Sequence, residues 1–563
     1  MGLLKKNKKK KPMRMSGAST TQQSNLRPSQ VEKLAPCIAS CPAGNDIRLW
    51  FNIIAQREKT GLELEEAYKK AFDVLAQTNP FPSVLGRVCP HPCEEHCNRV
   101  EKEGGVSINA LERFIGDWSL QKGVALPKIE GESEKTESIG VIGAGPAGLS
   151  FAYQMARRGY PVTIYEKTSK PGGMTYWGIP FYRLPEDVLL AEVKRIQDLG
   201  VEIKYNTKIG VDISADDLKS KHKAVFVAIG ADQARRLSIP GEEGPGVWGG
   251  TDYLAKLNGG EQVDVGKNVA VIGGGNTAID AARMARRVGA QVTILYRRTR
   301  QEMPAIEQEI EDALKEEVKI EYLVAPVEIK RDGDKVVAVV VQKMELGEPD
   351  ESGRRRPVPI EGSEYEIPVD SIIAAISQSP DFESLGGLKP EQRWYEQDKY
   401  FQVKEGLWVG GDVVNPDLVT TAVGQGRKAA EAMHAVLQGK EKPILEDPRP
   451  PIPPERIKMD LEEIYPTKQP VTPSHRPVDQ WLSEPDKEIV QGLSEEQFLE
   501  EVSRCFSCGL CFGCERCWMF CTPSCFAKVD NPGPGNYYSI NLDTCDGCKK
   551  CGDECPCGFI DLS

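Results

Sequence analysis

Residues 504–525 read RCFSCGLCFGCERCWMFCTPSC, and this stretch organises the interpretation of the whole chain. It places seven cysteines within 21 consecutive residues, although the chain of 563 residues has only 17. Thiolates at this density favour bound metal, because sets of four thiolates hold zinc ions or iron–sulfur clusters. Five more cysteines follow closely, at Cys545, Cys548, Cys551, Cys555 and Cys557.

Two runs in this region share the spacing C-x2-C-x2-C-x3-C, which is typical of bacterial two-cluster ferredoxins. In such a run three thiolates hold one [4Fe-4S] cluster and the fourth holds the other cluster. Zinc sites and disulfides are the alternatives, but two tandem copies of this spacing favour iron–sulfur clusters. The spacing predicts one cluster on Cys511, Cys514, Cys517 and Cys555, and another on Cys545, Cys548, Cys551 and Cys521.

The length predicts three or four domains, because a single core does not extend over 563 residues. No apolar run approaches 18 residues and no signal-peptide pattern follows the start, so we expect no transmembrane segment and a cytoplasmic protein. Cysteines in such a chain indicate metal binding in a reducing compartment, since disulfides are rare there.

The formal net charge is −12, but residues 1–30 contain six lysines, two arginines and no acid. The remaining residues therefore carry −20, which is −12 less 8. An acidic body argues against nucleic acid as a partner. Residues 1–30, with KKNKKKK at 5–11, are predicted to form a disordered basic tail; docking to an acidic partner or a membrane surface is the alternative.

Five further cysteines lie in residues 31–125, where apolar periodicity predicts short helices at 47–54 and 62–75. Five thiolates cannot fill two sites of four ligands. Either one cluster forms and one cysteine is left over, or other ligands come from elsewhere in the chain. These cysteines are Cys37, Cys41, Cys89, Cys93 and Cys97.

Four motifs resemble the iron–sulfur domain of the glutamate synthase small subunit and the N-terminal domain of dihydropyrimidine dehydrogenase. Three of them keep the family order: CIASCP at 37–42, GRVCPHPCEEHC at 86–97 and SINALE at 107–112. The fourth, SRCFSCG, precedes these motifs in the family but stands at 503–509 here. The resemblance therefore implies that Cys505 and Cys508 fold back onto the N-terminal region.

The resemblance also implies two ligand sets, one of which includes a carboxylate at Glu112. An ordinary surface acid on a helix is the alternative for Glu112. Cys525 and Cys557 stay unassigned, as small buried residues. The implied sets are Cys37, Cys97, Cys505 and Cys508 for one cluster, and Cys41, Cys89, Cys93 and Glu112 for the other.

Residues 138–150, SIGVIGAGPAGLS, combine a short apolar strand, a G-x-G-x-x-G turn and the start of a helix. In this fingerprint the first glycine makes the tight turn, the second admits a pyrophosphate, and the third lets helix and strand pack closely. Glu166, after a second predicted strand, is placed to bind a ribose hydroxyl. The motif predicts a dinucleotide site on Gly143, Gly145, Gly148 and Glu166.

The pattern recurs in residues 268–280, NVAVIGGGNTAID, with Gly273, Gly275 and Ala278 in the three places. The acid after its second strand is replaced by Tyr296 and Arg297, with Arg298 next. Guanidinium groups suit a 2'-phosphate, so this site favours NADP(H) over NAD(H). The alternative is that these arginines are solvated surface charges.

Two such motifs in one chain resemble the flavoproteins that hold FAD in the first site and a nicotinamide nucleotide in the second. Residues 171–185, 295–305 and 407–430 resemble the flavin loop, the NADP segment and the closing FAD motif of the glutamate synthase branch. The chain departs from the family pattern in a separate strand, where Ser377 takes the place of a common glycine. The resemblance implies FAD contacts at Gly143, Gly145, Pro146, Ala147, Gly148, Glu166, Lys167, Gly173, Met174, Gly411, Asp412, Thr421 and Ala422. It implies nicotinamide-nucleotide contacts at Gly273, Gly275, Asn276, Thr277, Ala278, Arg297 and Arg298.

We therefore expect a multidomain α/β chain. The expected parts are a basic tail (1–30), a helical Fe-S domain (31–125), a Rossmann-like FAD domain (138–240 and 373–440), a nested Rossmann-like NAD(P) domain (241–372), a proline-rich linker (441–500), and a cysteine-rich return segment with a ferredoxin-like α+β domain (501–563).

The expected function is that of an NAD(P)H-dependent oxidoreductase subunit moving electrons between NAD(P)H, FAD and four [4Fe-4S] clusters. A ferredoxin or a catalytic subunit of a redox complex is the expected partner, and no proton-transferring catalytic residue is needed. One alternative is the small subunit of glutamate synthase itself, against which the extra ferredoxin module argues. A zinc-binding scaffold is another, against which the two dinucleotide motifs argue.

Overall fold

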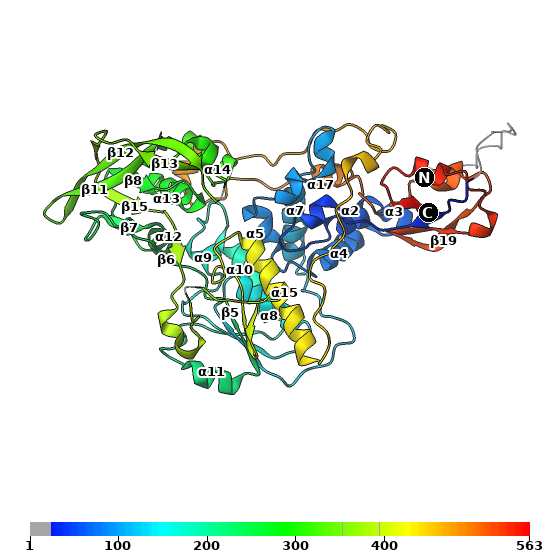
Figure 1. The fold of residues 1–563 in the computed structure, drawn as a ribbon, viewed down its shortest axis with the longest axis horizontal. Coiled ribbons are helices and arrows are strands. Elements are labelled where there is room, and N and C mark those ends of the chain that lie inside the picture. The colour runs from blue at the N-terminus through cyan, green and yellow to red at the C-terminus, as the bar shows by residue number, and fades with distance from the viewer. Residues whose placement is uncertain (1–23, 352, 393) are drawn as a thin grey trace, which may run out of the picture.

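The computed structural model describes residues 24–351, 353–392 and 394–563, and it shows a mixed α/β chain built of several units (Figure 1). The predicted multidomain α/β class is therefore confirmed. The basic stretch at residues 5–11 lies outside the described residues.

Residues 31–125 form a unit of short helices, which we call the helical unit. The helices predicted at 47–54 and 62–75 are present as α2 (Ile47–Ala55) and α4 (Leu64–Leu75). Asp46 caps α2 by accepting a hydrogen bond from the Leu49 N–H, and Trp50, Phe51 and Phe72 are buried between the two helices. The other helices are α1 (Pro36–Ala39), α3 (Arg57–Thr60), α5 (Pro82–Val88), α6 (Pro92–Glu95), η1 (Asn98–Glu101) and α7 (Ile108–Gln121).

A six-stranded sheet of order β17-β18-β5-β2-β3-β4 forms the first sheet unit, residues 138–232 and 380–440. Its central strands are apolar on both faces because helices cover both sides. Helix α8 (Pro146–Ala156) packs against α15 (Val419–Leu437) so closely that a Cβ at Gly426 would lie 2.3 Å from the Ala147 carbonyl oxygen.

The remaining elements of this unit frame the same sheet. They are β2 (Ile139–Ile142), β3 (Val162–Tyr165), α9 (Met174–Trp177), α10 (Glu186–Gln197), β4 (Glu202–Lys204), α11 (Ala215–Lys221), β5 (Ala224–Val227), η3 (Glu383–Leu388), β17 (Gln402–Lys404) and β18 (Leu407–Val409).

The second sheet unit, residues 235–377, is inserted into the first. The chain enters after β6 (Gln233–Ala234) and returns through β16 (Gln378–Ser379), and these two strands pair with each other. The parallel sheet of this unit has the order β10-β9-β8-β15-β7. Its last central strand, β15 (Ser371–Ala374), shows that the predicted boundary at residue 373 is wrong, because Ala374 still pairs within the inserted sheet.

The second sheet unit also contains an antiparallel sheet of strands β11, β12, β13 and β14. Figure 1 shows the whole unit in green at one end of the molecule. The elements of the unit are β7 (Val247–Gly249), α12 (Gly250–Asn258), β8 (Asn268–Ile272), α13 (Asn276–Arg287), β9 (Gln291–Tyr296), η2 (Arg300–Glu302), α14 (Glu307–Lys315), β10 (Lys319–Tyr322), β11 (Val324–Asp332), β12 (Lys335–Pro349), β13 (Arg355–Pro359) and β14 (Tyr365–Pro368).

The proline-rich segment runs over several units as predicted, but it is more tightly packed than a simple connector. The Ile452 N–H donates to the Leu34 carbonyl at 2.8 Å, and the Ile489 N–H donates to the Tyr182 carbonyl at 3.1 Å. Trp481 is 1% exposed and packs against Tyr182. The segment contains η4 (Pro454–Arg456) and α16 (Asp479–Ser483), and α17 (Glu495–Val502) follows it.

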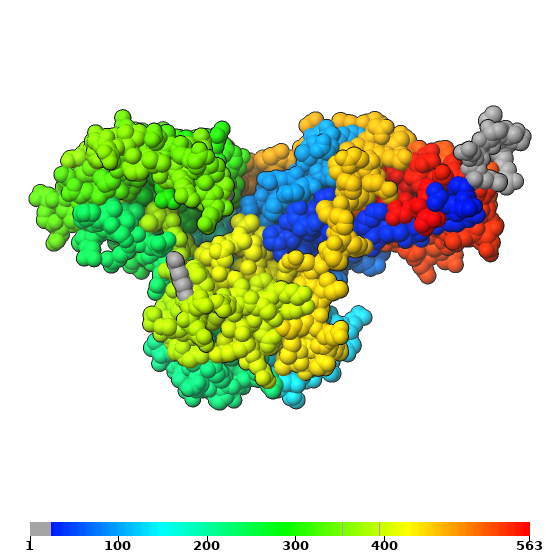
Figure 2. Space-filling model, in the orientation of Figure 1, coloured from blue at the N-terminus to red at the C-terminus, as the bar shows by residue number. Residues whose placement is uncertain are grey.

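The C-terminal unit, residues 501–563, has the α+β composition expected of a ferredoxin-like module. Its last strand pairs antiparallel with β1 (Pro28–Gln30), so the predicted disordered tail over residues 1–30 is wrong for its last residues. Figure 2 shows this N-terminal chain in blue against the red C-terminal unit. The elements are α18 (Arg516–Phe520), β19 (Phe526–Gly533), β20 (Asn536–Ile540), η5 (Leu542–Thr544), α19 (Lys550–Glu554) and β21 (Ile560–Leu562).

Arg504 joins the C-terminal unit to the helical unit. Its side chain is 1% exposed and donates to the carbonyls of Gly104 (2.8 Å) and Gly105 (3.1 Å), and it pairs with the buried carboxylates of Glu501 and Glu103. A buried guanidinium needs all of these acceptors, because an unpaired buried charge is strongly unfavourable. The predicted return of this segment to the N-terminal region is therefore present in the structure.

Arg504→Ala should loosen this junction, because it leaves the buried Glu501 carboxylate without a cation, whereas Glu103 keeps its ion pair with Arg99. We expect the free energy of local opening to fall by about 3 kcal/mol, measured by amide hydrogen exchange across residues 501–510. Arg456→Ala is the matched control, since its ion pair with Asp561 is exposed and should change opening by under about 1 kcal/mol. Equal protection in the two variants would contradict this assignment.

Candidate functional site

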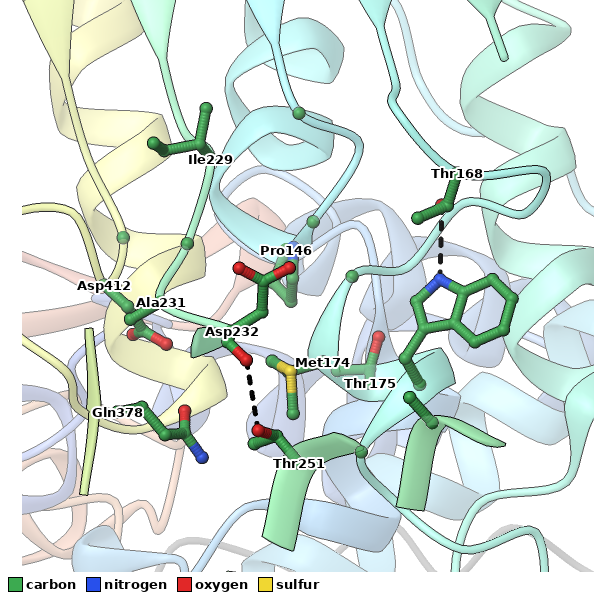
Figure 3. Close-up of a pocket in the computed structure, with 18 of the residues that line it drawn as sticks. Pro146, Thr168, Met174, Thr175, Ile229, Ala231, Asp232, Thr251, Gln378 and Asp412 are labelled. Atoms are coloured by element: carbon green, nitrogen blue, oxygen red, sulfur yellow. Dashed lines mark hydrogen bonds between the residues drawn. The ribbon is translucent and has the colours of Figure 1, made fainter. Parts of the chain in front are cut away.

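A cavity of about 660 Å³ lies where the first and second sheet units meet. The first glycine-rich turn lines it, and so do the first residues of the helices that follow the two turns, α8 and α13. The side chains of Met174, Gln378 and Asp412 surround this space, as Figure 3 shows. One cavity thus collects residues from both predicted dinucleotide sites.

The first glycine motif behaves as its fingerprint predicts. Gly143 has φ +100°, and a Cβ there would lie 2.4 Å from the Ala228 carbonyl oxygen. Gly145 faces open space, because the nearest atom to a Cβ built there is the Gly173 Cα, at 3.9 Å. Gly148 does not line the cavity, and a Cβ built there would lie 2.0 Å from the Gly143 carbonyl oxygen. The second glycine therefore admits a ligand, and the third packs helix on strand.

Glu166 lies at the end of β3 and lines the cavity. Its carboxylate accepts hydrogen bonds from the Ala144 N–H at 2.7 Å and the Thr168 N–H at 2.8 Å. These bonds hold the carboxylate between the glycine turn and the loop after β3. Lys167 also lines the cavity, where it pairs with Asp232.

Asp412 follows β18 at the start of the turn that leads into α15. Burial raises the pKa of Asp412 to about 6, and the neighbouring Asp417 carboxylate acts in the same direction. Gly411 and Ala422 line the cavity beside it, but Thr421 does not. The other predicted FAD contacts that line the cavity are Pro146, Ala147, Gly173 and Met174.

The second glycine motif has the same local geometry. Gly273 has φ +143°, and a Cβ there would lie 2.3 Å from the Ala375 carbonyl oxygen. Gly275 faces open space, because the nearest atom to a Cβ built there is in the Pro304 ring, at 3.9 Å. Asn276 and Thr277 line the cavity at the start of α13. Gly273, Gly275, Ala278, Arg297 and Arg298 are not among the residues that line it.

The two predicted 2'-phosphate arginines have different environments. Arg297 is exposed at the end of β9, and no hydrogen bond or ion pair is recorded for it within the described part of the chain. Arg298 is 5% exposed, donates to the Arg355 carbonyl at 2.7 Å and pairs with Asp350 at 2.6 Å. Arg298 therefore braces the loop, and Arg297 alone has a guanidinium available to a ligand.

Sequence reasoning missed an ion pair that joins the two sheet units at the cavity. Arg183, from the first unit, donates to both oxygens of Asp280 in α13 at 2.8 Å and contacts Glu309 at 3.0 Å. Burial raises the pKa of Asp280 to about 6, although the Arg183 charge opposes this. No local pattern reveals a pair 97 residues apart. Gln378, also missed, follows the carboxyl end of β15, where ligands commonly bind.

The predicted cluster ligands are brought together in four groups. The thiol of Cys37 lies among those of Cys97, Cys505 and Cys508, which we call group A. Group B is Cys41, Cys89, Cys93 and Glu112, around one small pocket. Group C is Cys511, Cys514, Cys517 and Cys555, around another, and group D is Cys521, Cys545, Cys548 and Cys551, around a third.

Glu112 lines the group B pocket beside the Cys41 and Cys89 thiols and is half-buried. Its Oε1 accepts a hydrogen bond from the Asn79 side chain at 2.6 Å, and burial raises its pKa to about 8. This position favours a ligand role over that of an ordinary surface acid, and the role of Glu112 stays a prediction. All 17 cysteines are free thiols. In the part of the chain that the structure describes, no three His, Cys, Asp or Glu side chains are arranged to hold a single metal ion.

Comparison with known proteins agrees with this arrangement. The pyridine nucleotide–disulphide oxidoreductase family matches residues 137–426, and the family described as dihydropyrimidine dehydrogenase domain II, 4Fe-4S cluster, matches residues 6–124. The chain thus belongs to the pyridine nucleotide–disulphide oxidoreductase family. No helix among the described residues is long and apolar enough to cross a membrane.

Three curated relatives refine this assignment. The NADPH-Fe(3+) oxidoreductase subunit beta of Geobacter sulfurreducens is 35% identical, over 84% of this chain and 75% of that protein. The glutamate synthase [NADPH] small chain of Escherichia coli is 34% identical, over 70% of this chain and 87% of that protein. The NADP(+)-dependent formate dehydrogenase subunit beta of Moorella thermoacetica is 39% identical, over 73% of this chain and 61% of that protein.

The chain is therefore an oxidoreductase of the NADPH-dependent flavin and iron–sulfur class, whose relatives include the small chain of glutamate synthase. The predicted resemblance and enzyme class are confirmed. The individual ligand assignments stay predictions.

Arg297→Ala should raise the KM for NADPH about 10- to 100-fold and leave the KM for NADH within about twofold, because only NADPH carries the phosphate that this guanidinium would bind. Arg298→Ala should weaken both cofactors alike, since it loosens a loop and removes no ligand. Steady-state kinetics with both nucleotides measure this, with the exposed Arg236→Ala as control. Equal effects of Arg297→Ala on NADH and NADPH would refute the assignment.

Asp412→Asn should raise the free energy of unfolding of the FAD-free protein above that of the wild type, and the difference should grow as pH rises from about 4 to 6. Unfolded aspartate titrates near 3.9, so in the wild type a raised folded pKa means stability that is present at low pH and lost as pH rises through about 6. The variant lacks this loss and should gain about 1 kcal/mol above pH 6, after allowing for solvent screening. Urea denaturation at pH 4 and 7.5 measures it; parallel pH profiles would contradict it.

Proposed function

We propose that this chain passes electrons from NADPH through FAD and four [4Fe-4S] clusters to a one-electron partner. The first sheet unit would bind FAD and the second NADP(H). The helical unit would hold two clusters and the C-terminal unit two more.

The residues of the first sheet unit fit FAD. Gly145 leaves room for a pyrophosphate at the N-terminus of α8, where free backbone N–H groups and the helix dipole favour anions. Glu166 and Asp412 would accept hydrogen bonds from ribose and ribityl hydroxyls at two sides of the cavity. The turn from Gly173 to Trp177 would cover the flavin from the water side.

The second sheet unit fits NADP(H) in the same manner. Gly275 is open at the N-terminus of α13, and Arg297 is available for a 2'-phosphate. The Arg183–Asp280 pair fastens this helix to the first unit beside the cavity. It would therefore hold the nicotinamide end of the cofactor against the flavin position.

The four thiol groups fit [4Fe-4S] clusters by their chemistry. Groups A, C and D each supply four cysteine thiols, and group B supplies three thiols and one carboxylate. When bound, FAD exchanges hydride with the nicotinamide and single electrons with iron–sulfur clusters, which is why such enzymes combine these cofactors.

The observation that carries the proposal is the contact between the cavity and group B. Val88 and Pro90, on either side of Cys89, line the cavity. On the opposite side, Thr420 of α15 lines the group B pocket and hydrogen-bonds the Cys89 thiol, while its neighbour Val419 lines the cavity. The neighbours of Cys89 and the adjacent residues Val419 and Thr420 would thus lie between the flavin position and the first cluster position.

The other groups follow in a continuous series. The Cys93 thiol of group B lies close enough to Cys37 of group A for their charges to interact. Group A connects to group C through the Gly509 N–H, which donates to the Cys557 carbonyl at 2.7 Å. The crossing ligands Cys521 and Cys555 then link groups C and D. Group D lies in the unit farthest from the second sheet unit (Figure 1).

Electrons would leave from group D to a ferredoxin or a partner subunit, and the direction can reverse with the supply of reductant. The formate dehydrogenase and Fe(3+) oxidoreductase relatives are named as subunits, which agrees with a partner of this kind. The small subunit of glutamate synthase is the second candidate. It is disfavoured because groups C and D form an added ferredoxin-like unit, and that relative matches 70% of this chain.

Cys505→Ser should interrupt the series between group B and group C without affecting the nucleotide sites. In anaerobic stopped-flow experiments with NADPH, flavin bleaching should keep its rate within about twofold, whereas the EPR signals of the group C and D clusters should appear at least about tenfold more slowly. Iron content should fall by one cluster. Unchanged C and D reduction would contradict the proposed order.

A further inference from the structure

Two cysteines remain outside the four ligand groups, and both are buried. Cys525 and Cys557 are each 2% exposed. A free thiol in a core can be a small apolar filler. Both of these thiols, however, lie against a thiol that crosses between groups C and D.

Cys557 lies against Cys555, the group C thiol that comes from the second cysteine run. The two Sγ atoms are 3.9 Å apart, within hydrogen-bonding distance for sulfur, and Cys557 lines the same pocket as group C. A ligating Cys555 is a thiolate and can only accept, so the Cys557 S–H is the donor. No other acceptor is recorded for that S–H in residues 24–351, 353–392 and 394–563.

Cys525 occupies the corresponding position beside Cys521, the crossing thiol of group D. Its backbone N–H donates to the Cys521 Sγ at 3.1 Å, its side chain pairs with the same sulfur, and it lines the group D pocket. The Thr544 hydroxyl lies beside the Cys525 thiol and donates to the Asn541 carbonyl at 3.1 Å. Each spare thiol thus lies beside one of the two crossing ligands.

We propose that Cys525 and Cys557 are S–H donors to the crossing ligands Cys521 and Cys555 and raise the reduction potentials of the clusters held there. This inference rests on the proposed function, since it requires clusters at groups C and D. A reduced cluster carries one more negative charge, so a donor to a ligand sulfur stabilises the reduced form. No covalent step is involved.

The position of Cys557 makes the effect most useful at group C. The Cys557 carbonyl accepts from Gly509, the residue after Cys508 of group A, so this residue lies between the two clusters. The buried ring of Tyr465 packs in the same cluster of buried side chains as Cys557 and Cys508. Holding the group C potential up would favour electron transfer from group A into the C-terminal unit.

The test uses the full-length protein purified anaerobically, with Cys557→Ala, Cys557→Ser and Cys525→Ala as variants. EPR-monitored redox titration should show one cluster moved to a more negative midpoint potential in Cys557→Ala, a different cluster moved in Cys525→Ala, and a value near the wild type in Cys557→Ser, which keeps a donor. The iron content should equal that of the wild type in all three variants. Each alanine variant serves as the control for the other.

Two results would overturn the inference. Unchanged potentials in both alanine variants, with full iron content, would show that these thiols only fill space. Loss of about four irons in an alanine variant would show that the spare thiol is itself a ligand. A wild-type protein without clusters at groups C and D would instead refute the proposed function, so the two failures are distinguishable.

Discussion

The buried ion pairs of Arg504 hold the two ends of this chain together, and the cluster groups depend on that junction. Its guanidinium reaches two carbonyls and the Glu103 carboxylate of the helical unit, while Arg48 of α2 donates in return to the Cys508 carbonyl at 2.7 Å. Breaking such a set leaves buried charges without partners, which makes the closed arrangement far more stable than a partly open one. Group A can therefore draw its thiols from both ends of the sequence.

A second constraint acts at the cavity, where the first sheet unit and the second unit inserted into it must direct their helices at one space. The paired strands β6 and β16 connect the units, and the Arg183–Asp280 pair fixes α13 against the first unit. The proline-rich segment strengthens this contact, because its Trp481 is buried beside Tyr182. The Arg287 guanidinium of α13 lies 3.7 Å from the centre of the same Tyr182 ring. The orientation of the two nucleotide positions thus depends on side chains from three separate parts of the chain.

Local chemistry was predictable from the sequence, and long-range pairing was not. The glycine turns require positive φ and close backbone approach, so Gly143 and Gly273 could be assigned from spacing alone. The fold-back of Cys505 was predictable because the motif that precedes the others in the resembling family stands near the C-terminal end here, at residues 503–509. The pairing of Arg298 with Asp350 was not predictable, because the two residues lie 52 positions apart and leave no trace in the local pattern. The pairing of β1 with the last strand was missed for the same reason.

The distribution of thiols also constrains how the protein assembles. Cys37 and Cys97 cannot be joined by Cys505 and Cys508 until nearly the whole chain has been synthesised, because about 400 residues separate the two pairs in the sequence. Ligand sets of this kind couple cluster insertion to folding, since the site does not exist in the unfolded chain. Group B, whose ligands lie within residues 41–112, has no such requirement. The group beside the cavity can therefore form first, and the group that connects it to the C-terminal unit forms only when the two ends have met.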